Sequence, residues 1–304
     1  MAKFFMLTLR VLKLAVVSSW LTVPAVHAAD ESVVVVGGTG ADCIEDPGCV
    51  NRLHPDIPMV VSAEPGQTIL FHTRDARDAL GASAQQSSEP DNFSSDFGRV
   101  HPITGPVYIS GASAGDVLKV TIVTIEPGPY AWSTGGSSGF VPGLVDGQSQ
   151  VIWRLNRNYA ETDDIPGVRI PNSSFPGIIT TLPGRNEHRR MLEREQALAE
   201  AGGRVSLPLT DYADPEELCG PGGAVAQACL RTIPPREHGG NMDIRYLQAG
   251  VSVYLPCYID GCGLAIGDLH YAQGDGEEPL GFAGLVLEEA EFEPRCGDLF
   301  GHPQ

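Results

Sequence analysis

The chain has 304 residues, with 20 basic and 38 acidic side chains and a formal net charge of −18. An acidic surface of this kind repels nucleic acids and anionic membranes, so neither is expected as a partner, whereas it tolerates neutral substrates and attracts divalent cations. With 36 glycines, 24 prolines and short β-branched runs between turn signals, the chain is expected to be mainly β.

The first residues predict a secretory signal. Three basic residues surround a short apolar run, and small residues precede Ala28. This order is typical of a signal that is cleaved after Ala28, with cleavage after Ala29 or an uncleaved anchor as the alternatives. Loss of residues 1–28 would leave 17 basic and 38 acidic side chains, a net charge of −21. We therefore expect one exported domain of residues 29–304, periplasmic or secreted, with no remaining membrane attachment.

Seven cysteines in an exported chain predict disulfide bonds. Six of them form pairs that are close in sequence, which leaves one over: Cys43/Cys49, Cys219/Cys229, Cys257/Cys262 and the single Cys296. The sequence alone fixes no connectivity, and a free catalytic thiol is the alternative interpretation of one of these residues.

The predicted strands run through most of the chain. They cover residues 32–38, 59–63, 67–73, 106–112, 116–126, 149–155, 251–259 and 282–292. Residues 186–203 form the only convincing helix, with apolar positions among many charges and glycines at its end. Residues 128–148 are predicted to be a Gly/Ser-rich lid or surface loop, and residues 210–240 a long connection pinned by cysteines. Together these elements predict one β-rich domain with a helical and loop excursion in its second half.

The motif NRLHPDIP carries His54 and Asp56 among prolines. Proline biases its neighbours towards extended conformations, and two residues apart on an extended chain share a side. That arrangement suits a shared metal ion or a proton relay. The alternative is a loop in which Asp56 caps a turn and His54 packs on the surface.

Two further motifs have plainer interpretations. HTRDARD, at 72–78, alternates arginine and aspartate and is expected to be a surface ion-pair cluster. RVHPITGPVYI, at 99–109, places His101 before a proline, a turn and a strand, and a simple turn explains it at least as well as a functional site.

The motif GDLHYAQGDGE, at 267–277, is the strongest candidate. Asp268 and His270 have i, i+2 spacing at the end of an apolar segment, so they would share one face of a strand. An aspartate and a histidine side by side can bind a divalent cation, or can act as a base with its orienting partner. An acidic β-hairpin is the alternative, and it leaves both residues unexplained.

The motif HGGNMD, at 238–243, follows a long connection. Gly239 and Gly240 let the backbone approach a ligand, and Asn241 could hold a carbonyl oxygen in an oxyanion-type site. The alternative is a loop end capped by asparagine and aspartate. Signatures of serine hydrolases, zinc peptidases, P-loop proteins and dinucleotide-binding domains are missing from the sequence.

Six motifs in this order resemble the acetamidase/formamidase family and extend from about residue 51 to 288. They are NRLHPDIP, PGQTILFHTRDA, RVHPITGPVYISGASAGDVLKVTIVTIEP, IPGVRIPNSSFPGIITTLPG, RTIPPREHGGNMDI and GVSVYLPCYIDGCGLAIGDLHYAQGDGE. The resemblance implies a mainly β fold with a β-sandwich-like body, a homo-oligomer, and hydrolysis of short linear amides to ammonia and a carboxylate. It also implies a bound metal ion, as in some members.

The chain departs from the family pattern at two places. His238 stands where many relatives read asparagine, and the cysteine that often follows the GDGE segment is absent. A mechanism that uses that thiol is therefore not open to this chain.

The resulting hypothesis is an amidase in which a divalent ion, zinc rather than calcium, or a carboxylate activates water. Asp268 and His270 would bind the metal, with His54 and Asp56 converging on them, Asn241 would stabilise the oxyanion, and Glu237 and Glu277 would carry protons. The alternatives are an amidase with a glutamate or cysteine nucleophile, a hydrolase of another amide or ester, and a non-catalytic exported β-sandwich ligand-binding protein with a structural metal ion.

Overall fold

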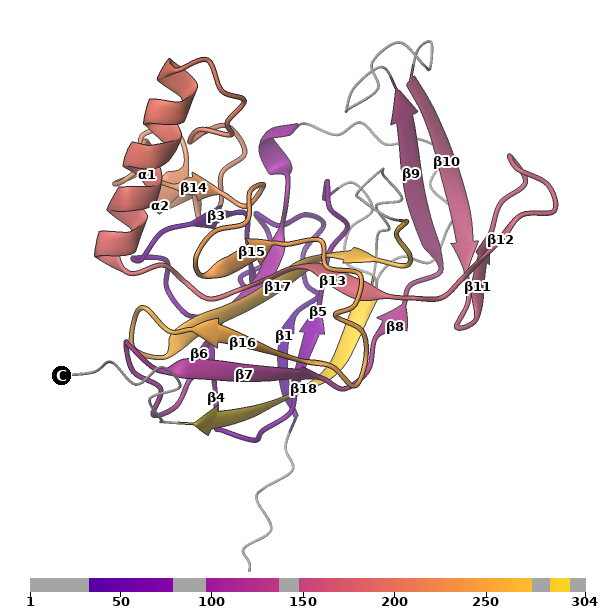
Figure 1. The fold of residues 1–304 in the computed structure, drawn as a ribbon, viewed down its shortest axis with the longest axis horizontal. Coiled ribbons are helices and arrows are strands. Elements are labelled where there is room, and N and C mark those ends of the chain that lie inside the picture. The colour runs from indigo at the N-terminus through magenta and orange to yellow at the C-terminus, as the bar shows by residue number, and fades with distance from the viewer. Residues whose placement is uncertain (1–32, 79–96, 137–147, 275–284, 296–304) are drawn as a thin grey trace, which may run out of the picture. The chain divides into compact units, whose positions relative to one another are not determined.

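A computed structural model describes residues 33–78, 97–136, 148–274 and 285–295 (Figure 1). The predicted signal, Glu277 and Cys296 fall outside these ranges. In the part of the chain that is described, no helix has the length and apolar character needed to cross a membrane. Strands make up most of the regular structure, which confirms the expected mainly β fold.

Two six-stranded sheets form the body of the protein (Figure 1). The first sheet has the order β1 (Val34–Gly37), β5 (Ile69–His72), β18 (Leu285–Arg295), β7 (Val117–Ile122) and β16 (Ser252–Pro256), with β8 (Glu126–Pro127) paired to β18. The second has the order β15 (Gly239–Asn241), β13 (Phe175–Thr180), β17 (Cys262–His270), β6 (Ile103–Ile109) and β2 (Cys49–Val50), with β4 (Val61–Ala63) paired to β6.

The two sheets share one hydrophobic core. Phe71 and Val120 come from the first sheet, and Val107 and Ile266 from the second, and all four are buried in the same cluster. Strand β7 alternates partly exposed and buried positions, as expected when one face of a sheet packs against another. This is the sandwich-like body that the family resemblance implied.

Smaller elements surround the sandwich. A four-stranded antiparallel sheet consists of β9 (Tyr130–Gly136), β10 (Gln148–Leu155), β11 (Tyr159–Glu161) and β12 (Arg169–Pro171), and β3 (Arg52–Leu53) pairs with β14 (Leu230–Arg231). The helices are α1 (Arg185–Glu200), α2 (Glu216–Cys219) and the 3₁₀ turn η2 (Phe97–Arg99). The face of α1 that includes Met191 packs on the cluster that contains Leu53 and Leu230.

The predicted helix and every predicted strand have counterparts in the structure. The prediction missed β13 and the short strands β2, β3, β11, β12, β14 and β15, and it did not assign the apolar segment before Asp268 as the nine-residue strand β17. Residues 128–148 are not irregular throughout, because β9 and the start of β10 lie in them, while 137–147 are outside the described ranges. Strand β17 is buried along its whole length. Such a strand lacks the alternation by which a half-buried strand is recognised.

The two cysteines of each expected pair lie close to each other. Their Cα–Cα distances are 5.3, 5.6 and 4.6 Å for Cys43/Cys49, Cys219/Cys229 and Cys257/Cys262. All six side chains are buried. The pairs close short loops at three separate places, and one of these loops joins β16 to β17.

Candidate active site

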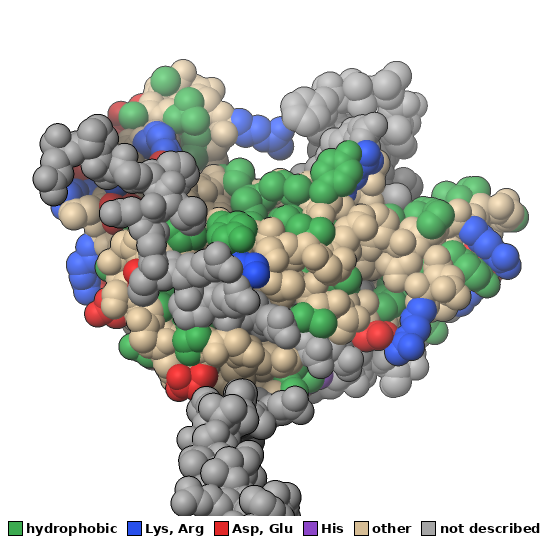
Figure 2. All heavy atoms as spheres, turned by 60° about the horizontal axis from the view of Figure 1, so that its bottom comes forward, with side chains coloured by type: hydrophobic (Ala, Val, Ile, Leu, Met, Phe, Trp, Pro, Cys, Tyr) green, Lys and Arg blue, Asp and Glu red, His purple; other side chains and the backbone are tan. Residues whose placement is uncertain are grey.

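Strand β17 places an aspartate and a histidine side by side. Asp268 and His270 are buried near the end of the strand, and Asp268 Oδ2 lies 3.5 Å from His270 Nε2. Asp268 has a φ of 49°, a left-handed conformation that costs energy in a residue with a side chain. On the face drawn in Figure 2, histidine side chains barely reach the surface. These two residues therefore form a buried polar pair at the end of an apolar strand.

A second carboxylate reaches this pair from across the sheet. Asp243 follows β15, and its Oδ1 lies 3.4 Å from His270 Nε2. Strand β13 separates β15 from β17, and Gly177 O of that strand accepts the backbone N–H of Asp243 at 3.2 Å. Gln273 Nε2 donates to Asp243 O at 3.1 Å. Two strands and the segment after β17 thus hold Asp243 against His270.

Strand β13, between β15 and β17, has a glycine at the point where Asp243 and His270 meet. A Cβ atom at Gly177 would lie 2.8 Å from both Asp243 Oδ1 and His270 Nε2, and 2.7 Å from Asp268 O. Real Cβ atoms do not approach other atoms so closely. Because residue 177 is glycine, the carboxylate and the imidazole can face each other over the backbone of β13.

His101 approaches from the other side of β17. It precedes β6, which pairs with β17, and its Nε2 lies 3.8 Å from Asp268 Oδ2. Thr232 Oγ1 accepts the His101 N–H at 2.7 Å and donates to His101 O at 2.9 Å. We call Asp243, Asp268 and His270 the Asp/His cluster, with His101 at its edge.

The charges of the cluster reinforce one another. Burial disfavours the charged form of His270, but the carboxylates of Asp268 and Asp243 outweigh it and raise the pKa of the imidazole to about 10. Burial likewise opposes ionisation of Asp268, but His101 and His270 lower the pKa of its carboxyl to about 2. Burial is the main reason why the pKa of His101 is lowered. The cluster therefore holds anionic carboxylates whose charge is only partly balanced.

The donor atoms of the cluster fit a metal ion. His270 Nε2 and Asp243 Oδ1 are buried and have no hydrogen-bond partner among the described residues, although buried polar atoms are normally bonded. A tetrahedral site with bonds of about 2.0–2.1 Å has donor atoms about 3.4 Å apart, close to the 3.4 and 3.5 Å found here. In the described ranges, this is the only group of three or more ligand-type side chains whose ligand atoms all lie within 4.8 Å of one another.

His54 and Asp56 do not join this cluster. The ring of His54 meets that of His188 on α1, with centroids 4.6 Å apart, and His54 Nδ1 accepts the Asp56 N–H at 3.1 Å. Asp56 forms an ion pair with Arg185. The expected convergence of His54 and Asp56 on β17 is thus not observed, because contacts with α1 engage both side chains.

The residues expected to act as proton carriers and oxyanion donors have separate positions. Glu237 is half-exposed and forms a two-contact ion pair with Arg194 on α1, away from the cluster. Asn241 is buried on β15, next to the strand that carries Gly177, and its Oδ1 has no partner among the described residues. Gly239 N–H donates to Arg236 O at 3.1 Å, so it is not free to bind an oxyanion.

The buried histidine His238 is tied to a neighbouring strand. Its Nδ1 lies 2.7 Å from Thr180 Oγ1 on β13, and burial, aided by Arg236, lowers the pKa of the imidazole to about 3. His238 is therefore neutral at physiological pH and packs within the sheet.

The HTRDARD motif forms a buried ion pair instead of the expected surface cluster. Arg74 is 1 % exposed, and its guanidinium contacts Asp46 Oδ2 at 3.2 Å and Asp78 Oδ1 at 3.3 Å. Asp46 is supplied by the loop that also holds the Cys43/Cys49 pair. The sequence could not show this partner because it lies 28 residues away.

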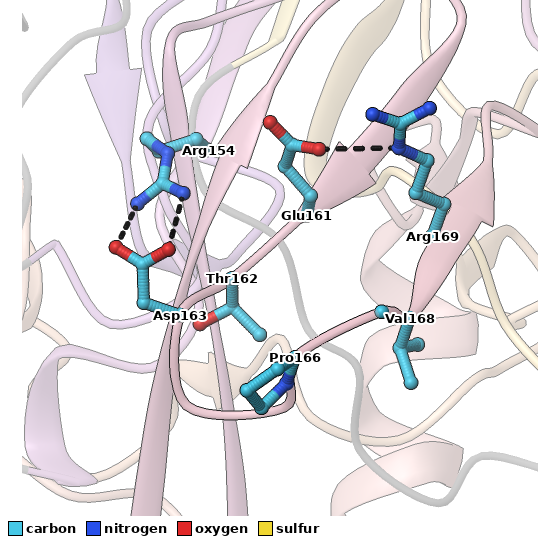
Figure 3. A pocket seen from close by; sticks show the side chains of 8 residues that line it. Arg154, Glu161, Thr162, Asp163, Pro166, Val168 and Arg169 are labelled. Carbon is cyan, nitrogen blue, oxygen red and sulfur yellow. Dashed lines mark hydrogen bonds and ion pairs between the residues drawn. The ribbon is translucent and has the colours of Figure 1, made fainter.

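A surface pocket of about 490 Å³ lies on the four-stranded sheet (Figure 3). Its charged side chains pair with one another, Arg154 with Asp163 at 2.9 Å and Arg169 with Glu161 at 3.2 Å. None of its lining residues belongs to the Asp/His cluster. Because its charges are already paired at an exposed surface, this pocket is a poor candidate for catalysis.

Comparisons with known proteins agree with the sequence resemblance. A putative formamidase of Schizosaccharomyces pombe is 34% identical over 269 residues, which cover 83% of this chain and 64% of that protein. A formamidase of Methylophilus methylotrophus is 33% identical, with 81% of this chain and 63% of that protein covered. The chain thus spans a little under two thirds of the length of these relatives.

A solved structure supports the fold. The gamma lactamase from Delftia acidovorans superposes with a TM-score of 0.73 at 30% identity, covering 84% of this chain and 66% of that one. The sequence also matches a described protein family across residues 41–291, which include all four residues at the cluster. The chain belongs to the Acetamidase/Formamidase family.

Proposed function

We propose that this protein is an amidase that hydrolyses the C–N bond of short linear amides and releases ammonia and a carboxylate. One observation carries the proposal: in a chain of this family, two carboxylates and an imidazole meet over Gly177, and His270 Nε2 and Asp243 Oδ1 are buried with no hydrogen-bond partner among the described residues. The names of the formamidase relatives support the substrate class.

We further propose that Asp243, Asp268 and His270 hold a divalent cation, zinc rather than calcium. Imidazole nitrogen with carboxylate oxygen is a donor set that zinc accepts readily, whereas calcium prefers six or more oxygens. Such an ion, when bound, supplies a Lewis acid and lowers the pKa of water to about 7. The pKa of the Asp268 carboxyl is about 2, so that residue is ionised as a ligand must be. The pKa of His270 is raised to about 10, so its imidazole would have to release a proton when the ion binds.

The remaining roles belong to groups around the cluster. Burial lowers the pKa of His101, and its Nε2 faces Asp268, which suits a base that takes a proton from the attacking water and passes it to the leaving nitrogen. The side-chain amide of Asn241 can donate to the carbonyl oxygen of the substrate, a contact in which one donor is worth about 3 kcal/mol. Glu237, bound to Arg194, has no part in this scheme.

The thiol alternative conflicts with the fold. Cys257 and Cys262 face each other as a buried pair, and Cys262 begins the strand that ends with His270. At about 3.3 Å per residue, the two ends of β17 are roughly 25 Å apart. A cysteine there could not share a substrate with His270.

The test is ammonia release from formamide, acetamide and propionamide by purified mature protein, before and after chelation and return of zinc. Asp268→Asn should abolish release, and the matched control Asp260→Asn should keep it, because Asp260 is at the surface and only accepts the Ala114 N–H. Ammonia that survives both chelation and Asp268→Asn would contradict the mechanism. If no amide releases ammonia, the non-catalytic binding protein becomes the better interpretation.

We also propose that the chain is exported and that its three close cysteine pairs are disulfide bonds. The basic and apolar character of residues 1–28 and the burial of all six paired cysteines support this. Intact mass of protein recovered from the periplasm or medium should match a chain that begins after Ala28 and has lost six hydrogens. A full-length chain with free thiols would contradict it.

A further inference from the structure

The segment from Arg231 to Asp243 supports both sides of the Asp/His cluster. At one end, Asp243 contacts His270. At the other, Thr232 holds the backbone of His101 through two hydrogen bonds. This one segment therefore links Asp243 to His101, in addition to the contacts that each makes with its neighbouring strand.

Arg236 lies in the middle of the segment and fixes its shape. Its guanidinium Nη1 donates to Arg231 O at 2.7 Å, so the side chain folds back on the start of the segment. Its backbone exchanges two hydrogen bonds with Gly239, at 2.7 and 3.1 Å, which closes the turn that leads into β15. Two residues beyond β15, Asp243 is bonded to Gly177 O.

Glu195 of α1 holds the guanidinium in this position. Its carboxylate accepts Arg236 Nε at 2.7 Å and Nη2 at 3.1 Å. The Arg236 side chain is wholly buried and that of Glu195 is 10 % exposed. A planar two-contact pair of this kind fixes direction as well as distance, and without its partner the buried guanidinium would be left uncompensated.

The residues adjacent to Glu195 and Arg236, on α1 and on the segment, form a second ion pair that contrasts with the first. Arg194 and Glu237 also make two contacts between α1 and the same segment, but their side chains are 54 % and 48 % exposed. Exposed ion pairs contribute little because water and salt screen them. The buried and exposed pairs join the same two elements, so they provide a matched test.

We propose that Glu195 is a positioning residue that acts through Arg236 to keep Asp243 and His101 in register with Asp268 and His270. It touches none of the four. The inference rests on the proposed metal-assisted amidase, since its effect on catalysis is an effect on metal binding.

The experiment compares Glu195→Gln and Glu195→Asp with Arg194→Gln in the mature protein. Zinc affinity of the metal-free protein, kcat per bound zinc, and hydrogen exchange of the Met242 and Asp243 amides are measured. We expect Glu195→Gln to weaken zinc binding about tenfold, to lower kcat with KM within twofold, and to speed exchange at both amides. Glu195→Asp, which keeps the charge, should give a smaller effect of the same kind, and Arg194→Gln should match the parent.

Parental zinc affinity, kcat and exchange in both Glu195 variants would overturn the proposal. If Glu195→Gln does not fold, Glu195→Asp decides by the same criteria. If the parent binds no zinc, the proposed function fails, whereas hydrogen exchange still tests the positioning role: faster exchange in the Glu195 variants alone supports it, and unchanged exchange rejects it.

Discussion

Two regions of the molecule carry the same pair of residues at the same spacing and use them differently. His54 and Asp56 lie against α1, where the aspartate pairs with Arg185 and the histidine ring meets His188. Asp268 and His270 lie on β17, where both ring nitrogens of His270 are buried and have no hydrogen-bond partner among the described residues. In the first region neighbouring side chains engage the pair, whereas in the second the carboxylates and the imidazole face one another at 3.4 and 3.5 Å, a spacing into which a metal ion fits.

The electrostatics separate the two regions further. Burial, and then His188, lower the pKa of His54 to about 4, so this histidine is neutral. In the cluster, two carboxylates overcome burial and raise the pKa of His270 to about 10. At neutral pH that imidazole is protonated, so a metal ion would take the place of its proton between the two carboxylates. The difference shows that an Asp/His pair becomes a metal-site candidate through what surrounds it.

The largest effect is expected from filling the space between the cluster residues. Gly177→Ala places a methyl group 2.8 Å from Asp243 Oδ1 and His270 Nε2, so it should remove zinc binding and amidase activity together. Gly274→Ala is the control, because a Cβ at that glycine meets nothing within 4 Å. Zinc titration and ammonia release measure both variants, and an active Gly177→Ala enzyme would contradict the proposed site.

The next test replaces the histidine of each pair by asparagine. His270→Asn should lower kcat at least ~100-fold, more than the loss of an outer partner of a metal site usually costs. His54→Asn should change kcat less than about threefold, since His54 contacts α1 and not the cluster. Steady-state kinetics, measured together with melting temperatures, would distinguish a loss of catalysis from a loss of folding. An equal loss of kcat in the two variants would contradict the difference proposed between the two regions.

Acid should weaken the region of His54. The pKa of this histidine is about 4 in the folded protein and about 6.5 in the unfolded chain, so its contribution to stability is complete above pH 6.5 and is lost as the pH falls through 4. That contribution is at most about 3.5 kcal/mol, because the two pKa values differ by about 2.5 units and each unit corresponds to about 1.4 kcal/mol. Denaturant unfolding from pH 7 to pH 4 should show a shallower decline in His54→Asn, and parallel curves would reject the account.

The smallest effect is expected at the surface pair beside His54. Arg185 and Asp56 are 74 % and 36 % exposed, so Arg185→Gln should cost less than about 1 kcal/mol, with a smaller difference at high salt. Activity should not change. A loss of several kcal/mol, measured by urea unfolding at two salt concentrations, would mean that this pair holds the region together.

Much of the fold could be predicted from the sequence because its half-buried strands alternate clearly. Strand β17 escaped assignment since it is buried on both faces, and β13 since its sequence FPGIIT begins with an aromatic, a proline and a glycine. These two strands carry Asp268, His270 and Gly177. Both strands at the site are therefore among those that periodicity did not reveal, together with β9, β11 and β12 of the four-stranded sheet.

The site was predicted in part. The spacing of Asp268 and His270 revealed their contact, because it depends on one strand alone. Asp243 lies in the motif HGGNMD and His101 precedes a proline, but the sequence indicates no contact of either with Asp268 or His270, since their places depend on strand order. Gly177 gave no signal, because its contribution is the absence of a side chain. His54 and Asp56 were assigned to the metal because Arg185 lies 129 residues away.

The most direct measurement is anomalous X-ray scattering at the zinc edge from crystals of the mature protein grown with zinc. The account predicts a peak bounded by Asp243 Oδ1, Asp268 Oδ2 and His270 Nε2, above Gly177. Crystals without a peak at that position, or with a peak beside His54 and His188 instead, would contradict it.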